Sequence, residues 1–209
     1  MKIIRAGAVI EQCTPDLELL IERAGRVCYK SEDRICEGSA EKMIGSLMEK
    51  HHESVIEHGA ITVRFICDRG VSHELVRHRL ASFSQESTRY CNYGADKHGN
   101  EVTFIDLRGG FPDMSVRSGN IWLDAMLDAE RKYLDMLAAG LSAQEARSVL
   151  PNSLKTEVVM TANPREWRHV FKMRASKAAH PQMREIMIPL LHEFQARWPS
   201  LYNDIKESV

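Results

Sequence analysis

The sequence contains no long hydrophobic run and almost no excess charge. Its longest apolar stretches, such as residues 186–191, are far shorter than the ~20 residues that a membrane-spanning helix needs. Arg5 and Glu11 interrupt the N-terminal segment, so we expect neither a secretory signal peptide nor a membrane partner. The 209 residues carry a formal net charge of −1, which provides no positive field to attract the phosphates of nucleic acid. Membrane proteins and nucleic-acid-binding proteins are therefore disfavoured.

Closely spaced cysteine pairs are also missing. The five cysteines stand at positions 13, 28, 36, 67 and 91, and no CxxC motif occurs. An odd number of scattered cysteines indicates free thiols in a reducing compartment, so we expect a cytoplasmic protein without a disulfide framework or a zinc ribbon. Free cysteines are commonly small core residues, and we expect this of Cys91 rather than a role as nucleophile.

The common nucleotide-binding and nucleophile motifs GxGxxG, Walker A and GxSxG are absent as well. The segment from His73 to His78 resembles HExxH, but its histidines are five residues apart. On a helix they would lie about 140° apart, too far around it to share one zinc ion. A second cluster would suit the metal site of a hydrolase, and it comprises His51, His52, His58, Glu53 and Glu57. At a helix end, however, histidines and carboxylates more commonly cap the helix or form hydrogen bonds. We predict no metal site.

What the sequence does contain is the composition of a folded domain, with 44% hydrophobic and 27% charged residues, and we expect one domain over residues 1–209. Apolar patterning predicts strands at 2–10, 61–65, 102–107 and 156–162. Helical spacing predicts helices at 16–29, 38–51, 72–80, 118–139 and 164–176, and a last one from Pro181. Because these elements form no βαβ units, we predict an α+β fold, a central, mostly antiparallel sheet flanked by helices. We expect Glu130, Arg131 and Lys132 on a solvated helix face.

The run RHRLASFSQESTRY at residues 77–90 is the most distinctive feature. If Ser72 caps a helix that reaches residue 80, Glu74 and Arg77 share one helix face and Arg79 points away from it. Such a helix would present cationic groups to two ligands. On an extended chain, Ser87 and Arg89 would point the same way, which suits a phosphate group. The alternative is a basic helix end followed by a solvated loop.

These residues resemble a known family. Arg77, His78 and Arg79, followed by seven residues and then Ser87, match the RHRx7S motif of the flavin-dependent thymidylate synthases. The flanking segments VSHELVRHR and SFSQESTRY are similar to the same family, as are EARSVLPNSLKTE at 145–157 and TANPREWRHVFKMRAS at 161–176. The resemblance covers nearly the whole chain.

The resemblance implies a specific reaction. Enzymes of this family methylate dUMP to dTMP, with 5,10-methylenetetrahydrofolate as carbon donor, NADPH as reductant and FAD as the carrier of the hydride. They are homotetramers whose active sites lie between subunits, and they use no enzyme nucleophile. In this sequence Ser87 has no adjacent base that would activate it, which agrees with that chemistry.

The resemblance also implies the roles of individual residues. Arg174 would lie against the pyrimidine and polarise it, and Arg147 would reach dUMP from another subunit. The complete set implied for dUMP is Glu74, Leu75, Val76, Arg77, Gln85, Glu86, Ser87, Thr88, Arg89, Arg147 and Arg174. The set implied for FAD is Ser54, Arg77, His78, Arg79, Gln85, Asn163, Pro164, Arg165 and His169.

The sequence departs from the family at two places, and two other functions remain open. Glu74 stands where members often have Gln; since an ionised carboxylate cannot donate a hydrogen bond, we expect it to pair with a neighbouring Arg or His. The spacing from Arg174 to His180 is longer than in members of the family, so His180 is given no role. The alternatives to a synthase are a catalytically silent nucleotide-binding protein and a metal-dependent nucleotide hydrolase.

Overall fold

The computed structural model describes residues 1–95 and 99–207, and it confirms the α+β prediction. Its internal contacts divide the chain into two compact units. The first unit comprises Met1–Gly7, Phe65–Arg77 and Ser84–Val158, and the second comprises Ala8–Arg64, His78–Phe83 and Val159–Val209. The expectation of one domain over 1–209 stays a prediction. None of the helices in the described part of the chain combines the length and apolar character that a membrane span requires.

The main sheet has the strand order β2-β3-β6-β4. Its strands are β2 (Gly7–Cys13), β3 (Ile61–Asp68), β6 (Lys155–Ala162) and β4 (Ser82–Gln85). The start of β3 lies beside the end of β6, where the hydroxyls of Thr62 and Thr161 are 2.9 Å apart. At the other end of β3, the Arg69 amide donates to the Asn152 carbonyl just before β6 begins. These two strands therefore run antiparallel, as predicted.

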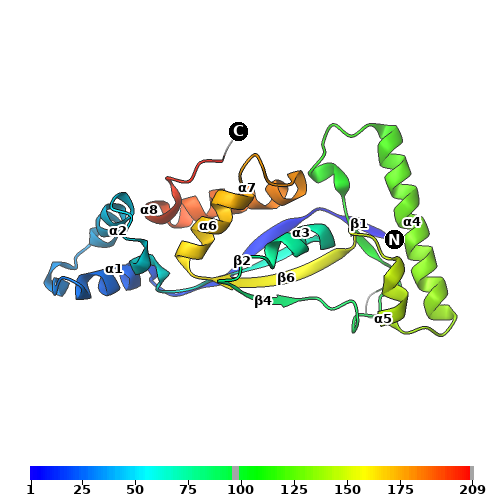
Figure 1. Cartoon of the computed structure of the whole chain (residues 1–209), viewed down its shortest axis with the longest axis horizontal. Helices are drawn as coiled ribbons and strands as arrows, with labels where there is room; N and C mark the ends of the chain where they lie inside the picture. The colour runs from blue at the N-terminus through cyan, green and yellow to red at the C-terminus, as the bar shows by residue number, and fades with distance from the viewer. Residues whose placement is uncertain (96–98, 208–209) are drawn as a thin grey trace. The chain divides into compact units, whose positions relative to one another are not determined.

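Aromatic side chains form the core of the second unit. Its helices are α1 (Leu17–Val27), α2 (Ser39–Glu49), α6 (Pro164–Arg174), α7 (Pro181–Arg197) and α8 (Pro199–Tyr202), the last three drawn yellow to red in Figure 1. Phe171 and Phe194 pack edge to face with ring centroids 4.9 Å apart. Trp167 is fully buried and donates from Nε1 to the Ile61 carbonyl at 3.0 Å. This packing holds α6 in a fixed position against its neighbours. The helix from Pro181, predicted to be the last, is followed by the short α8.

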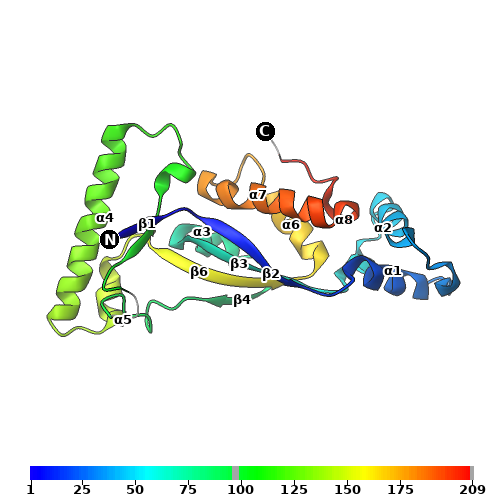
Figure 2. The same cartoon turned by 180° about the vertical axis from the view of Figure 1, so that it is seen from behind.

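The first unit has a smaller core around α4 (Val116–Ala138), which lies beside the N-terminal strand (Figure 2). There β1 (Lys2–Ile4) pairs in parallel with β5 (Thr103–Ile105). The predicted strand 2–10 is therefore two strands in two sheets. Glu130 is buried and accepts from the Val102 amide at 2.8 Å. The prediction of a solvated Glu130 was wrong, because the buried Val102 amide just before β5 needs a hydrogen-bond acceptor, and the Glu130 carboxylate is that acceptor.

The helix before the RHR run is shorter than predicted. It is α3 (Arg69–Leu75), and its N-terminal cap is Asp68, whose side chain accepts from the Val71 amide at 2.7 Å. Ser72 does not cap it, because its hydroxyl lies inside the helix and donates to the Arg69 carbonyl. Residues 77–79 therefore lie beyond the helix, and the predicted helical faces of Glu74, Arg77 and Arg79 do not exist as such.

Candidate active site

In the first unit, the segment that follows β4 is held in place by a buried amide. Gln85 donates from Nε2 to the hydroxyl of Ser72 at 2.9 Å and to that of Thr156 at 3.3 Å. Ser72 belongs to α3 and Thr156 to β6. Gln85 therefore ties the beginning of the predicted nucleotide segment to two rigid elements.

Glu86 is committed to partners inside the protein. It accepts from the Tyr93 hydroxyl at 2.8 Å and from Lys155 Nζ at 3.0 Å, and Lys155 also contacts Glu157 at 2.5 Å. Burial raises the pKa of the Tyr93 hydroxyl, and the Glu86 carboxylate adds to that effect. Although burial acts in the opposite direction, Glu157 and Glu86 raise the pKa of Lys155. These contacts point to a positioning role for Glu86.

Ser87 and Arg89 do not lie on an extended chain. The Tyr90 and Cys91 amides both donate to the Ser87 carbonyl, at 3.1 and 2.9 Å, so these residues form a turn. The Arg89 guanidinium lies 5.5 Å from the ring centroid of Tyr90. The extended chain on which the prediction for this pair was based is therefore absent, because β4 ends at Gln85.

Next to this turn is a pocket of about 500 Å³ with a cationic wall. Arg147, at the start of the 3-10 helix η5 (Arg147–Val149), donates from Nη1 to the Thr88 hydroxyl at 3.1 Å. Both line the pocket, together with Arg69 and His73 from α3. Guanidinium groups and a hydroxyl on one wall suit a phosphate. Arg69 and His73 were missed by the sequence analysis, which had no means of placing α3 beside η5.

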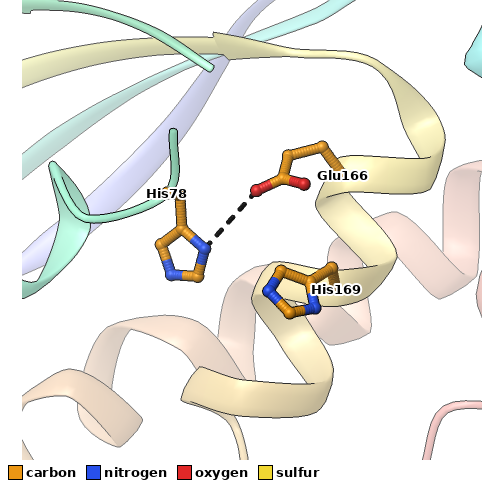
Figure 3. A group of neighbouring side chains, drawn as sticks. All are labelled: His78, Glu166 and His169. Atoms are coloured by element: carbon orange, nitrogen blue, oxygen red, sulfur yellow. Dashed lines mark ion pairs between the residues drawn. The ribbon is translucent and has the colours of Figure 1, made fainter. Parts of the chain in front are cut away.

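In the second unit, His78 meets residues from α6 (Figure 3). Its Nδ1 lies 3.5 Å from Glu166 Oε1, and Arg174 donates from Nε to His78 Nε2 at 3.1 Å. The His169 ring packs edge-on to that of His78, with centroids 5.7 Å apart. Three residues of the predicted site, His78, His169 and Arg174, are thus brought together. Glu166 is the fourth member of the group, and the sequence analysis missed it. Its signal was the spacing of three residues between Glu166 and His169, which share a helix face.

The electrostatics of this cluster keep His78 uncharged at neutral pH. Burial lowers the pKa of His78 from 6.5 to about 4, and the neighbouring Arg174 and His169 add to that shift. Burial also raises the pKa of Glu166. Because Nε2 accepts from Arg174, the single ring proton of His78 belongs on Nδ1, facing Glu166.

The residues at the start of α6 have structural partners. Asn163 caps the helix by accepting from the Glu166 amide at 2.8 Å, and Pro164 occupies its first turn. Arg165 contacts Glu57 at 2.5 Å and Glu53 at 3.4 Å, both in the 3-10 helix η2 (Glu53–Glu57). Ser54 lies in η2 and is exposed.

The remaining predicted residues follow or end α3. The Leu75 side chain is fully buried, which leaves only its backbone for a ligand. Val76, Arg77 and Arg79 are exposed. Glu74 is partly buried on α3 and has interaction partners. His51, His52 and His58 are not part of the one cluster in residues 1–95 and 99–207 whose donor atoms converge closely enough for a metal ion, which is His78, Glu166 and His169.

Comparison with known proteins identifies the family. Residues 9–200 match the family described as "Thymidylate synthase complementing protein". A flavin-dependent thymidylate synthase from Geobacter sulfurreducens is 30% identical over 200 residues, which cover 92% of this chain and 84% of that protein. This chain belongs to the flavin-dependent thymidylate synthase family. The family resemblance inferred from RHRx7S and its flanking segments is confirmed.

Other relatives agree with this assignment. The flavin-dependent thymidylate synthase of Corynebacterium diphtheriae is 32% identical over 211 residues, covering 96% of this chain and 83% of the relative. A crystal structure of the UMP/dUMP methylase PolB from Streptomyces cacaoi, bound with 5-Br dUMP, is similar with a TM-score of 0.79 and 25% identity. The match covers 97% of this chain and 96% of the PolB chain. A protein of similar structure is therefore described as a methylase of UMP and dUMP.

The residues of the second unit fit the flavin that this family uses. The exposed Arg79 supplies positive charge and donors of the kind that a diphosphate needs, and Arg165 adds a guanidinium that is already paired with Glu57 and Glu53. His78 is uncharged, so it adds no further positive charge here, and its two ring nitrogens face Arg174 and Glu166. His169 is exposed and adds a second imidazole beside it. We take these residues as the candidate flavin-binding group.

Proposed function

We propose that this protein methylates dUMP to dTMP, with 5,10-methylenetetrahydrofolate as carbon donor, NADPH as reductant and FAD as bound cofactor, and that it works as a homotetramer without a cysteine nucleophile. The observation that carries the proposal is the Arg174 guanidinium, which a neutral, buried His78 holds through a 3.1 Å hydrogen bond. Family membership and the cationic pocket beside Thr88 add support.

Arg174 supplies the electrostatic part of the mechanism. C5 of uracil is a weak nucleophile, and it becomes nucleophilic when the ring takes on enolate character, with negative charge on its oxygens. A permanently charged guanidinium at those oxygens stabilises that charge. His78 accepts from Arg174 Nε without adding a second positive charge, so the guanidinium is oriented before the substrate binds. FAD, when bound, supplies the hydride chemistry that amino acid side chains lack.

The cationic pocket of the first unit holds the nucleotide phosphate in this proposal. Arg147 and Thr88 supply a guanidinium and a hydroxyl, and Arg69 and His73 complete the wall. Gln85 and Glu86 keep the segment in place through their bonds to α3, β6 and Tyr93. The role of Arg147 at the dUMP of another subunit, which the family resemblance implies, stays a prediction and is an alternative to this arrangement within one chain.

The cysteines near this segment are poorly suited to be nucleophiles. Cys67 is fully buried, and burial raises the pKa of its thiol to about 12. Cys91 packs against the core of the first unit. Because the thiolate is the reactive form, these environments support a mechanism without a covalent enzyme–pyrimidine bond.

The first test is the absorption spectrum of the purified protein after saturation with FAD and removal of free flavin. We expect a retained flavin band that shifts when dUMP is added. We then expect dTMP to form only when both NADPH and methylenetetrahydrofolate are present. Absence of retained flavin would favour the silent nucleotide-binding protein, and nucleotide hydrolysis that needs added metal would favour the hydrolase.

A second candidate activity is methylation of UMP, which the similarity to PolB favours. The two nucleotides differ only in the 2′-hydroxyl of the ribose. Competition between dUMP and UMP in one reaction gives the ratio of kcat/KM directly. A ratio above about 10² would assign dUMP as the substrate, because a difference of that size corresponds to about 2.7 kcal/mol.

Replacement of Arg147 by alanine tests the phosphate pocket. We expect KM for dUMP to rise about 10- to 100-fold while kcat changes by less than threefold, because Arg147 binds the phosphate equally in the ground and transition states. Thr88→Val, which removes the hydroxyl that Arg147 contacts, should raise KM by a smaller factor. Arg117→Ala, a change at an exposed position of α4, is the matched control. An unchanged KM in Arg147→Ala would remove the residue from the dUMP site.

Replacement of Glu74 by glutamine tests the departure from the family. We expect KM for dUMP and its pH dependence to stay within about threefold of wild type, because Glu74 has partners inside the protein. The measurement is the steady-state KM between pH 6 and 9. A KM at least tenfold lower in Glu74→Gln would instead show that this position contacts the pyrimidine and prefers a donor.

A further inference from the structure

Three potential metal ligands converge in the second unit, on residues that the sequence analysis did not connect. They are His78, Glu166 and His169, and their donor atoms all lie within 4.8 Å of one another. Glu166 and His169 project from one turn of α6, and His78 faces them from the segment 78–83 (Figure 3). Two imidazoles and one carboxylate form the donor set of many sites for Zn²⁺ and related ions.

The spacing already approaches that of a bound ion. With metal–ligand bonds of about 2.0–2.1 Å, two donors on one tetrahedral ion lie roughly 3.3 Å apart. His78 Nδ1 and Glu166 Oε1 are 3.5 Å apart. The third donor, on His169, lies within 4.8 Å of the other two, and its side chain is exposed rather than packed in the core.

The supporting structure is rigid, and it has an entrance. Residues next to the ligands anchor α6, because Trp167 and Phe171 are fully buried and Asn163 caps its first turn. His78 and Glu166 are buried, whereas His169 is exposed. An ion can therefore reach the site at His169 and bind two preorganised donors behind it.

We propose that His78, Glu166 and His169 bind a divalent transition-metal ion such as Zn²⁺ in the flavin-free protein, and that the bound ion releases Arg174 from His78. The release follows from the tautomer. An ion on Nδ1 takes the lone pair of that nitrogen, so the ring proton must move to Nε2. A protonated Nε2 cannot accept from Arg174 Nε, and the 3.1 Å hydrogen bond is lost.

The ion is therefore an antagonist of the proposed synthase. It withdraws the acceptor that orients Arg174, and it occupies imidazoles that belong to the candidate flavin-binding group. This consequence rests on the proposed function, but the binding of the ion does not. The two are tested separately.

Binding is tested with Co²⁺ alone, added to untagged protein from which flavin and metals have been removed. We expect one equivalent of Co²⁺ to give visible d–d absorption bands, and Zn²⁺ to abolish them by displacement. Glu166→Gln and His169→Asn should each weaken Co²⁺ binding at least tenfold. Glu193→Gln, at a partly exposed position of α7, and His192→Asn, at an exposed one, are the matched controls and should bind Co²⁺ as wild type does.

Absence of saturable bands would overturn the proposal, and so would bands that persist unchanged in both ligand variants or disappear equally in the controls. His169 is exposed, so His169→Asn keeps the test valid even if Glu166→Gln does not fold. The consequence is tested by adding Zn²⁺ to the FAD-binding assay, with the apparent Kd for FAD as readout. We expect Zn²⁺ to raise that Kd at least tenfold in wild type and much less in Glu166→Gln. An equal effect in both would overturn the competition, whereas failure of the proposed synthase activity would leave the Co²⁺ result unaffected.

Discussion

Replacement of Arg174 by alanine is expected to lower kcat for dTMP formation by about 10²- to 10³-fold, the effect of removing one preorganised charge-stabilising group. The effect belongs in kcat because the guanidinium acts on charge that develops during the reaction, rather than on the ground state. Single-turnover kinetics with saturating dUMP and reduced enzyme measure it. Burial leaves His78 neutral, so loss of the arginine leaves no unpaired charge on His78.

Arg174→Lys is the informative companion of the alanine variant. Lysine restores the positive charge but not the planar fork, and it has no Nε–H in the position that donates to His78. We expect kcat between those of wild type and Arg174→Ala, with bound FAD retained in both variants. A kcat within threefold of wild type in Arg174→Ala would show that the pyrimidine is polarised by another group.

The second large effect concerns stability. Arg168 lies on α6 with its guanidinium almost completely buried, and it donates to the two carboxylate oxygens of Asp204 at 2.6 and 2.5 Å and to the Leu201 carbonyl. Asp204→Ala leaves this buried charge without its carboxylate. We expect a loss of about 2–4 kcal/mol, toward the lower value because the Asp204 side chain is 56% exposed. In thermal unfolding this corresponds to a Tm lower by roughly 5–10 °C.

The same pair gives a pH dependence with a definite sign. The hydrogen bonds from Arg168 lower the pKa of Asp204 below its ordinary value of 3.8, although burial acts in the other direction. The folded protein then binds this proton less tightly than the unfolded chain does, so the stabilisation is complete above pH 3.8 and is lost as the pH falls through the folded-state pKa. The stability difference between wild type and Asp204→Asn should therefore shrink in acid.

Urea unfolding at several pH values measures that difference. Asp128→Asn is the matched control, because Asp128 forms an exposed ion pair with Arg131 on α4 and should contribute less than about 0.5 kcal/mol. Equal destabilisation by Asp204→Asn and Asp128→Asn would contradict the assignment of the buried pair.

Local sequence signals were sufficient wherever one segment determines its own structure. Pro164 at the first turn and Asn163 before it correctly predicted the start of α6. Gly140, with a φ of 92°, stands just past α4, as its position predicted. The predicted helix at 72–80 was wrong because the sequence offers two possible N-terminal caps, Asp68 and Ser72. Asp68 caps the helix by accepting a hydrogen bond from the Val71 amide, and Ser72 lies inside it.

The sequence by itself determined the α+β class, most of the helices, and, through RHRx7S and its flanking segments, the family. Tertiary structure alone decided which side chains meet. Glu166 is 88 residues from His78 along the chain, Lys155 is 69 residues from Glu86, and Arg147 is 59 residues from Thr88. Periodicity shows which face of an element is buried, but not which element covers it. Protonation states, too, were decided only by the tertiary structure. The low pKa of His78 arises from burial and from the neighbouring Arg174, and neither is a property of the RHR segment.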